Sequence, residues 1–245
     1  MNNTKLLVLS LISLVLSSCG KQDLCDCLKS TGEMQEEIRI SSDFNSIELR
    51  DNVDLYLRQD SICTIKVVAG ENLIKGIITD CLNGSLMIRN TNSCNWVRNM
   101  GNPVSVYISV PDLTRLTYKA YGNIITEDTL RMQELRIDVV DGSGSLFLWL
   151  RNSVTRLNMH EGVVDVQLSG RTGVSYIYNH GIGPVDALNL KSDITFITNN
   201  SIGNSYVHVL NMLDARIEYH SNIYYRGNPS GITASITGSG QLIPY

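Results

Sequence analysis

Polar side chains that could bind a metal ion recur at one phase of the chain, with a step of about twenty residues. The recurring positions are Asp141, His160 or Glu161, His180, Asn200, His220 and Thr237. If successive steps stack as strands, His160 and His180 stand about 5 Å apart and could share a zinc ion, with Glu161 as a third ligand. We favour the alternative of a column of turn residues that bond the local backbone, and we expect no cofactor.

Acidic side chains could also support glycoside cleavage, which needs two carboxylates about 5 to 9.5 Å apart across a cleft. The candidates are Asp138, Asp141, Glu161 and Asp165. Nothing in the sequence indicates that two of these carboxylates act as a pair. Acidic residues at intervals are also expected on the surface of any soluble solenoid. The triplet at residues 142–144 lacks the strand-to-helix elbow that activates a catalytic serine. We therefore expect a protein that is not an enzyme.

Aromatic side chains at outward positions are candidates for a binding face. Trp149, Tyr176 and Tyr178 could pack on sugar rings or on peptide side chains, so the expected ligand is a glycan or a protein. The same residues could instead form cross-strand pairs that stabilise the sheet. With 20 Lys and Arg against 24 Asp and Glu, and no basic patch interleaved with aromatics, we expect no nucleic-acid partner.

Two columns of apolar residues indicate the elements that must position these side chains. One consists of Ile137, Leu157, Ile177, Ile197, Ile217 and Ile236, and the other of Leu135, Val154, Val174, Ile194, Leu213 and Ile232. We interpret both as inward positions of a solenoid. A rung of about twenty residues is too short for a helical repeat, and alternation at Leu146, Leu148 and Leu150 is typical of strands. The prediction is an all-β, single-stranded β-helix.

The organisation along the chain is predicted to be one domain over residues 43–245. Residues 113–245 carry the regular rungs. Residues 43–112 alternate without the strict step, so they are expected to form less regular N-terminal rungs or a cap. A cap is needed because an uncovered terminal rung would present unpaired backbone groups to other chains.

The first residues are predicted to be a targeting sequence. Residues 1–18 have the basic Lys5 and then the apolar run of a signal peptide. The end of this run, Leu16-Ser17-Ser18-Cys19, resembles the bacterial lipobox, which implies that Cys19 carries the lipid anchor. Residues 19–42 are polar and are expected to form a flexible tether.

Cysteine usage is compatible with an oxidising compartment. Beyond Cys19 the chain has an odd set of thiols, at Cys25, Cys27, Cys63, Cys81 and Cys94. A disulfide among them is allowed in the envelope, and the sequence leaves its pairing open.

Several short motifs together resemble one family. They are Phe44-Asn45-Ser46-Ile47, residues 104–111, Asp141-Gly142-Ser143-Gly144 and residues 223–229. The pattern is similar to the head GIN domain family, described as a "putative auto-transporter adhesin". The resemblance implies a right-handed β-helix in a bacterial envelope protein, often a lipoprotein, and it brings no catalytic residues.

We therefore predict a lipid-anchored protein of the bacterial envelope, on the outer membrane, with a non-catalytic, adhesin-like binding module. The alternative is a periplasmic structural or protein-interaction scaffold, and a third reading is a β-helix enzyme acting on polysaccharides. The anchor makes the membrane one partner. The residues after Cys19 leave open whether the domain faces the periplasm or the outer surface.

Overall fold

The structure is a computed structural model that describes residues 30–93 and 103–245. The predicted signal peptide, Cys19 and the first part of the tether lie outside these residues, as do Cys25, Cys27 and Cys94. Within the described ranges no helix is long and apolar enough to cross a membrane. Cys63 and Cys81 are both free thiols.

The described chain folds into strands of one continuous sheet, with a short 3-10 helix, η1, at Ile74–Gly76. The strands are β1 Met34–Arg39, β2 Ser46–Asp51, β3 Asp54–Gln59, β4 Thr64–Gly70, β5 Ile77–Leu82, β6 Ser85–Asn90, β7 Ser105–Val110, β8 Arg115–Ala120, β9 Ile124–Thr126, β10 Leu130–Gly142, β11 Ser145–Met159, β12 Asp165–Asn179, β13 Val185–Asn199, β14 Ser205–Ile217, β15 Ile223–Arg226, β16 Gly231–Ile236 and β17 Leu242–Pro244.

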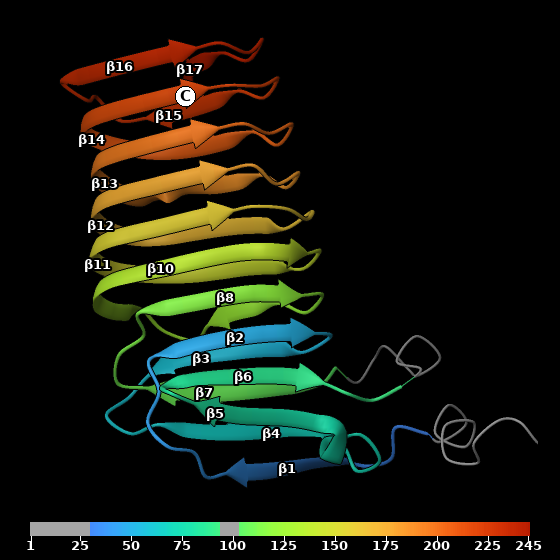
Figure 1. Ribbon diagram of the computed structural model, residues 1–245. Helices are drawn as coiled ribbons and strands as arrows, with labels where there is room; N and C mark the ends of the chain where they lie inside the picture. Colours follow the sequence, from blue (N-terminus) through green and yellow to red (C-terminus); the bar gives the residue numbers. More distant parts are fainter. Residues whose placement is uncertain (1–29, 94–102) are drawn as a thin grey trace, which may run out of the picture.

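The regular rungs form a flattened coil (Figure 1). Strands β11, β12 and β13 each run for 15 residues and bend once, so each supplies both faces of its rung. We call the faces A and B. Face A contains β7, β3, β9 and the first halves of β11 to β14, and face B contains β6, β2, β8 and the ends of β10 to β14. Parallel pairing of β11 with β12, from Ser145↔Asp165 to Met159↔Asn179, confirms the β-solenoid with rungs of about twenty residues. The right-handed coil stays a prediction.

The first apolar column is confirmed as a line of inward side chains from Ile137 to Ile217, but its last member, Ile236 on β16, is 49% exposed. Ile137, Leu157, Ile177 and Ile197 are paired rung to rung and all are buried. In β14 the register shifts, so Ile197 lies opposite Ala215 and Ile217 lies opposite Asn199. The column therefore continues through alanine, although the spacing of isoleucines in the sequence stays nearly constant.

The second apolar column was predicted correctly at Leu135 and Leu213, which are buried, but in the wrong phase at the three members between them, and Ile232 is 46% exposed. Val154, Val174 and Ile194 are only half-buried. The residues opposite the inward Leu135 are instead Thr155, Ser175 and Thr195, which are buried. Because side chains alternate between the two faces of a strand, an error of one residue exchanges inside for outside. The corner of the rung lies here, and it allows branched apolar residues to remain partly exposed.

The N-terminal rungs are not stacked in chain order. Strand β2 lies between β6 and β8, and β3 lies between β7 and β9, all in parallel. Strand β4 then runs antiparallel to β7, and β5 runs antiparallel to β6, at the end of the coil nearest β1 (Figure 1). The chain therefore leaves the rung of β2 and β3, builds this end, and passes back over that rung to begin β8.

The predicted tether over residues 19–42 is too long, because Met34–Arg39 forms β1. This strand pairs antiparallel with β4. Five of its six side chains are exposed and the sixth is half-buried. Backbone pairing with β4 and hydrogen bonds from Arg39 to Thr79 and to the carbonyl oxygen of Ile74 therefore hold this segment, and burial of apolar side chains does not.

Candidate binding face

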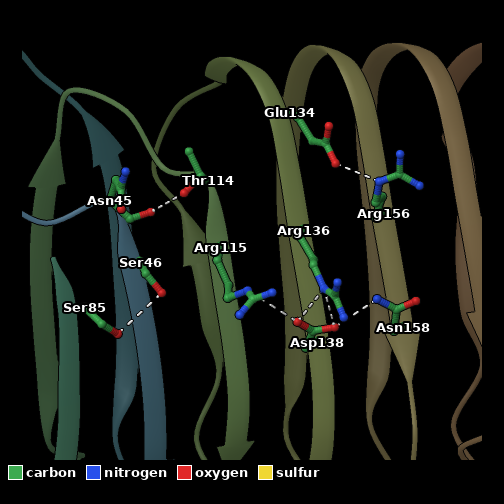
Figure 2. Close-up of polar contacts among 10 residues, drawn as sticks. All are labelled: Asn45, Ser46, Ser85, Thr114, Arg115, Glu134, Arg136, Asp138, Arg156 and Asn158. Atoms are coloured by element: carbon green, nitrogen blue, oxygen red, sulfur yellow. Dashed lines mark hydrogen bonds and ion pairs between the residues drawn. The ribbon is translucent and has the colours of Figure 1, made fainter. Parts of the chain in front are cut away.

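Three arginines occupy one outward position on successive rungs of face B. Arg115 on β8 pairs with Arg136 on β10, which pairs with Arg156 on β11 (Figure 2). The residues that follow each of them, Leu116, Ile137 and Leu157, are buried, so strand alternation directs the arginines to solvent. We did not identify this row from the sequence, although it follows the same step of about twenty residues.

Asp138 lies within this row, and its side chain is only 11% exposed. Arg136 Nε donates to both of its oxygens, at 3.0 and 2.8 Å, and Asn158 Nδ2 donates to Oδ1 at 2.9 Å. Arg115 Nε lies 3.7 Å from Oδ2. Burial by itself would raise the pKa of Asp138, but the hydrogen bonds from Arg136 and Asn158 and the two nearby positive charges outweigh it and lower the pKa. This carboxylate is therefore held ionised.

Arg156 is oriented by two contacts. Its Nε donates to Glu134 Oε1 at 2.7 Å, and its guanidinium lies 4.1 Å from the ring centroid of Tyr176. In each of the three arginines a carboxylate engages Nε. The side chains of the three arginines are 50%, 45% and 38% exposed, so part of each guanidinium remains open to solvent. The row thus presents oriented donors to solvent.

A groove of about 710 Å³ opens beside Arg115 and Arg136. All of its lining residues carry polar or charged side chains. They are Ser46, Ser85, Thr114, Asn83, Gln133, Asp112, Glu134, Arg115 and Arg136. It lies where residues 111–114 pass over the rung of β2 to begin β8. Thr114 Oγ1 donates to the carbonyl oxygen of Asn45 at 3.1 Å and ties this crossing to the rung beneath it (Figure 2).

The predicted metal ligands are adjacent but do not form a cluster of three. His180 Nδ1 lies 3.1 Å from the carbonyl oxygen of His160, so a ring nitrogen faces the backbone of the neighbouring rung. Glu161 is exposed in the same turn. No three His, Cys, Asp or Glu side chains gather around a common point in the part of the chain that the structure describes.

The predicted turn column also departs from its step at its end. The backbone N–H of His180 bonds to Met159, and that of Asn200 bonds to Asn179. At the next rung Glu218, and not His220, donates to Asn199. The shift of register in β14 causes this change, and His220 instead lies 2.6 Å from Ser239 Oγ.

The aromatic candidates lie on opposite faces and do not form one site. Trp149 is 56% exposed on face A, whereas Tyr176 and Tyr178 belong to face B. Tyr176 is covered by Arg156 on one side and stacks on Phe196 at 5.1 Å between ring centroids. Its two ring faces are therefore occupied by neighbours.

Tyr178 lies in a similar stack. Its ring centroid is 6.5 Å from that of His160 and 6.1 Å from that of His180. The tyrosines of face B therefore act as cross-strand pairs, and of the three candidates Trp149 is the most exposed.

The acidic candidates for catalysis are spread over different parts of the coil. Asp138 belongs to face B, and Asp165 begins β12 on face A, where it is exposed. Asp141 Oδ1 accepts a hydrogen bond from the adjacent Gly142 N–H at 2.7 Å, which is a local turn contact. Glu161 lies in the turn after β11. These carboxylates do not face one another across a common cleft.

The fold and the arginine row of face B define the class of protein, a β-solenoid with a polar, solvent-exposed sheet face. The chain belongs to the family described as "Putative auto-transporter adhesin, head GIN domain", whose model matches residues 43–229. The resemblance stated from the sequence motifs is thereby confirmed. No curated protein matches the chain.

Solved structures from Bacteroides and Parabacteroides species share the fold. A "putative adhesin" from Bacteroides fragilis has a TM-score of 0.79 at 18% identity, covering 87% of this chain and 97% of the other. A "putative lipid binding protein" from Parabacteroides distasonis has a TM-score of 0.65 at 18% identity, covering 88% and 98%. A "putative adhesin" from Parabacteroides merdae has a TM-score of 0.62 at 17% identity, covering 88% and 98%. At these identities the likeness concerns the fold.

Proposed function

We propose that the protein is a lipid-anchored, non-catalytic binding module of the bacterial outer membrane, with an adhesin-like role. The observation that carries the proposal is the row of Arg115, Arg136 and Arg156, each oriented through Nε by a carboxylate while its side chain stays 38–50% exposed. Oriented, partly exposed donors on a rigid face favour recognition, because these side chains lose little conformational entropy when a partner binds. Family membership and the lipobox-like sequence at Cys19 support the same role.

Binding is better supported than catalysis at this face. A glycosidase needs one carboxyl with a raised pKa to act as the general acid. The pKa of Asp138 is lowered by its hydrogen bonds to Arg136 and Asn158 in spite of its burial. A carboxylate held in this way orients its neighbours and is a poor proton donor.

Lipid binding, the role named for the P. distasonis protein, is less well supported for this chain. The groove beside Arg115 has no apolar side chain in its lining. An acyl chain placed there would lie among polar and charged side chains and would gain less from leaving water than in an apolar cleft. The proposed lipid is therefore the covalent anchor at Cys19 and not a ligand of the groove.

Two measurements test the proposal. Replacing the anchor residue, Cys19→Ala, should move the protein from the membrane fraction to the soluble fraction, while Cys63→Ala should leave it with the membrane. Protease added to intact cells, with a periplasmic protein as control, should digest the domain. If it is protected while the periplasmic control is also protected, surface adhesion is excluded and a periplasmic scaffold takes its place.

A further inference from the structure

We infer that the groove between the N-terminal rungs and the regular coil binds a short, hydroxyl-rich stretch of glycan. This inference rests on the proposed binding function and names the chemical class of its ligand. The groove has a volume of about 710 Å³ and is open to solvent along face B. That volume lies within the range of about 300–1,000 Å³ that is usual for small-molecule sites.

The lining matches the hydrogen-bonding pattern of a sugar. A sugar hydroxyl both donates and accepts, so it needs donors and acceptors together. The amides of Asn83 and Gln133 offer both, and neither has a hydrogen-bond partner in the described part of the chain. Arg115 and Arg136 add Nη donors, and Asp112 adds acceptor oxygens.

The charges of the lining argue against a polyanion. The lining holds two arginines, Arg115 and Arg136, and two carboxylates, Asp112 and Glu134. Asp138 lies directly beside the two arginines, and Glu134 pairs with Arg156, so the three arginines of the row face three carboxylates. Nucleic-acid binding depends on an excess of positive charge that releases counterions. A balanced set of charged groups instead supplies directional hydrogen bonds to a neutral polyol.

The groove is held in shape before any ligand arrives. Asp138 positions Arg136 with contacts of 3.0 and 2.8 Å, and Thr114 is bonded to the backbone of Asn45 at 3.1 Å. Ser46 and Ser85, on neighbouring strands, lie 3.4 Å apart through their hydroxyl oxygens (Figure 2). Such preorganisation lowers the entropic cost of binding a flexible saccharide. Arg156, on the next rung, extends the donor row for a longer glycan.

The test uses the full chain on an array of neutral, amino and acidic oligosaccharides. We expect binding to neutral oligosaccharides, with affinity reduced about tenfold or more in the double variant Asn83→Gly with Gln133→Ala, since two hydrogen-bonding groups are lost. Glycine keeps the positive φ of 51° at position 83. The matched control is Gln167→Ala, an exposed glutamine of face A, which should bind as the unmodified chain does.

A second pair of variants separates the groove from the rest of face B. Arg115→Ala removes a half-exposed arginine 3.7 Å from its carboxylate and should weaken binding. Arg216→Ala removes a similar arginine, 3.9 Å from Asp214 on the distant β14, and should leave binding unchanged. Melting temperatures of all four variants are compared so that a loss of binding is not a loss of folding.

Three results would overturn the inference. They are the absence of binding to every oligosaccharide, equal binding by the groove variants, and binding confined to polyanions, including single-stranded DNA, that disappears in high salt. In each case the proposed envelope function stands if protease still digests the domain on intact cells. Conversely, protection from protease defeats surface adhesion even where the purified chain binds a sugar.

Discussion

The regular coil and the N-terminal rungs use the same strands but join them differently. In the coil, Asn158 bonds to Asp138, 20 residues earlier, and each rung rests on the one that precedes it in the chain. At the N-terminal rungs, Thr114 bonds to Asn45, 69 residues earlier, because β2 is enclosed by strands that follow much later. The repeated part supplies a regular face, and the out-of-order part supplies the crossing that borders the groove.

The two regions also differ in their interiors. The inward positions of β2 and β3, such as Leu49 and Leu57, are apolar and fully buried. In the coil, Thr155, Ser175 and Thr195 face inward at the corner of each rung. Thr155 Oγ1 donates to Asn152 Oδ1 at 3.0 Å, and Thr195 and Ser192 bond through their hydroxyls. Polar groups are tolerated there because corner residues of the same rungs satisfy most of them.

The largest effect is expected from the rung that is out of order. Leu49→Ala empties a fully buried position on β2 between β6 and β8, and should lower the free energy of unfolding by about 2–5 kcal/mol in urea titrations. Leu82→Ala, at a residue that is 73% exposed on β5, is the control and should stay within about 0.5 kcal/mol of the unmodified chain. Equal effects of the two would contradict the enclosure of β2.

Substitution of glycine should cost more stability in the coil than in the turn between β5 and β6. Gly170 on β12 has φ +109°, and a Cβ there would stand 2.0 Å from the carbonyl oxygen of Leu150. Gly170→Ala should cost about 2–5 kcal/mol, since both the left-handed backbone and the overlap oppose it. Gly84 has φ +75° with its nearest neighbour at 3.9 Å, so Gly84→Ala should cost only about 1–2 kcal/mol. Thermal unfolding of both variants measures the order, and a reversed order would contradict the close stacking of the coil.

Tyr118 joins the two regions and should have an intermediate effect. Its hydroxyl donates to the carbonyl oxygen of Gly122 at 2.7 Å and accepts from Gly144 N–H at 2.9 Å, and burial raises its pKa to about 12. Tyr118→Phe leaves both backbone groups without that partner and should cost about 1–3 kcal/mol. Tyr121→Phe, at a residue that is 64% exposed, should cost almost nothing in the same unfolding experiment. A Tyr118 variant as stable as the Tyr121 variant would show that the hydroxyl does not hold the turn.

The smallest effect concerns the charge of Asp138 on face B. Its folded pKa is lowered below the usual value of 3.8, so the ionised form stabilises the fold above that value, and this contribution is lost as the pH falls through the lowered pKa. The stability difference between the unmodified chain and Asp138→Asn should therefore be constant at neutral pH and should shrink in strong acid. Asp193→Asn, which removes a surface partner of Arg171 at 3.2 Å, is the control with little difference at any pH. A difference that grows in acid would contradict the assignment.

Much of the coil could be predicted because its signals are local. Burial of Ile137, Leu157 and Ile177 follows from alternation within a strand and from the step between rungs. The error at Val154 and Val174 arose where the strand turns its corner and the phase of alternation changes. Their branched apolar side chains were taken as inward, whereas the inward positions are hydroxyls, which hydropathy does not detect.

The candidate site was harder to predict than the fold. The row of Arg115, Arg136 and Arg156 follows the repeat period in the sequence. Charged residues at such intervals are also common on any protein surface, so only the strand register shows that the three form one row. The turn column attracted attention because histidine is a metal ligand. In the folded chain the Nδ1 atom of His180 lies against a backbone carbonyl oxygen.

The sequence by itself determined the solenoid, the length of its rungs and the family, because alternation and repetition are written in neighbouring residues. Only the tertiary structure decided that β2 lies between β6 and β8 and that β1 pairs with β4. It also decided that a groove opens where the chain passes over the rung of β2 to begin β8. These features depend on backbone hydrogen bonds between distant segments. Such bonds can form with almost any side chain, so they leave no pattern in the sequence.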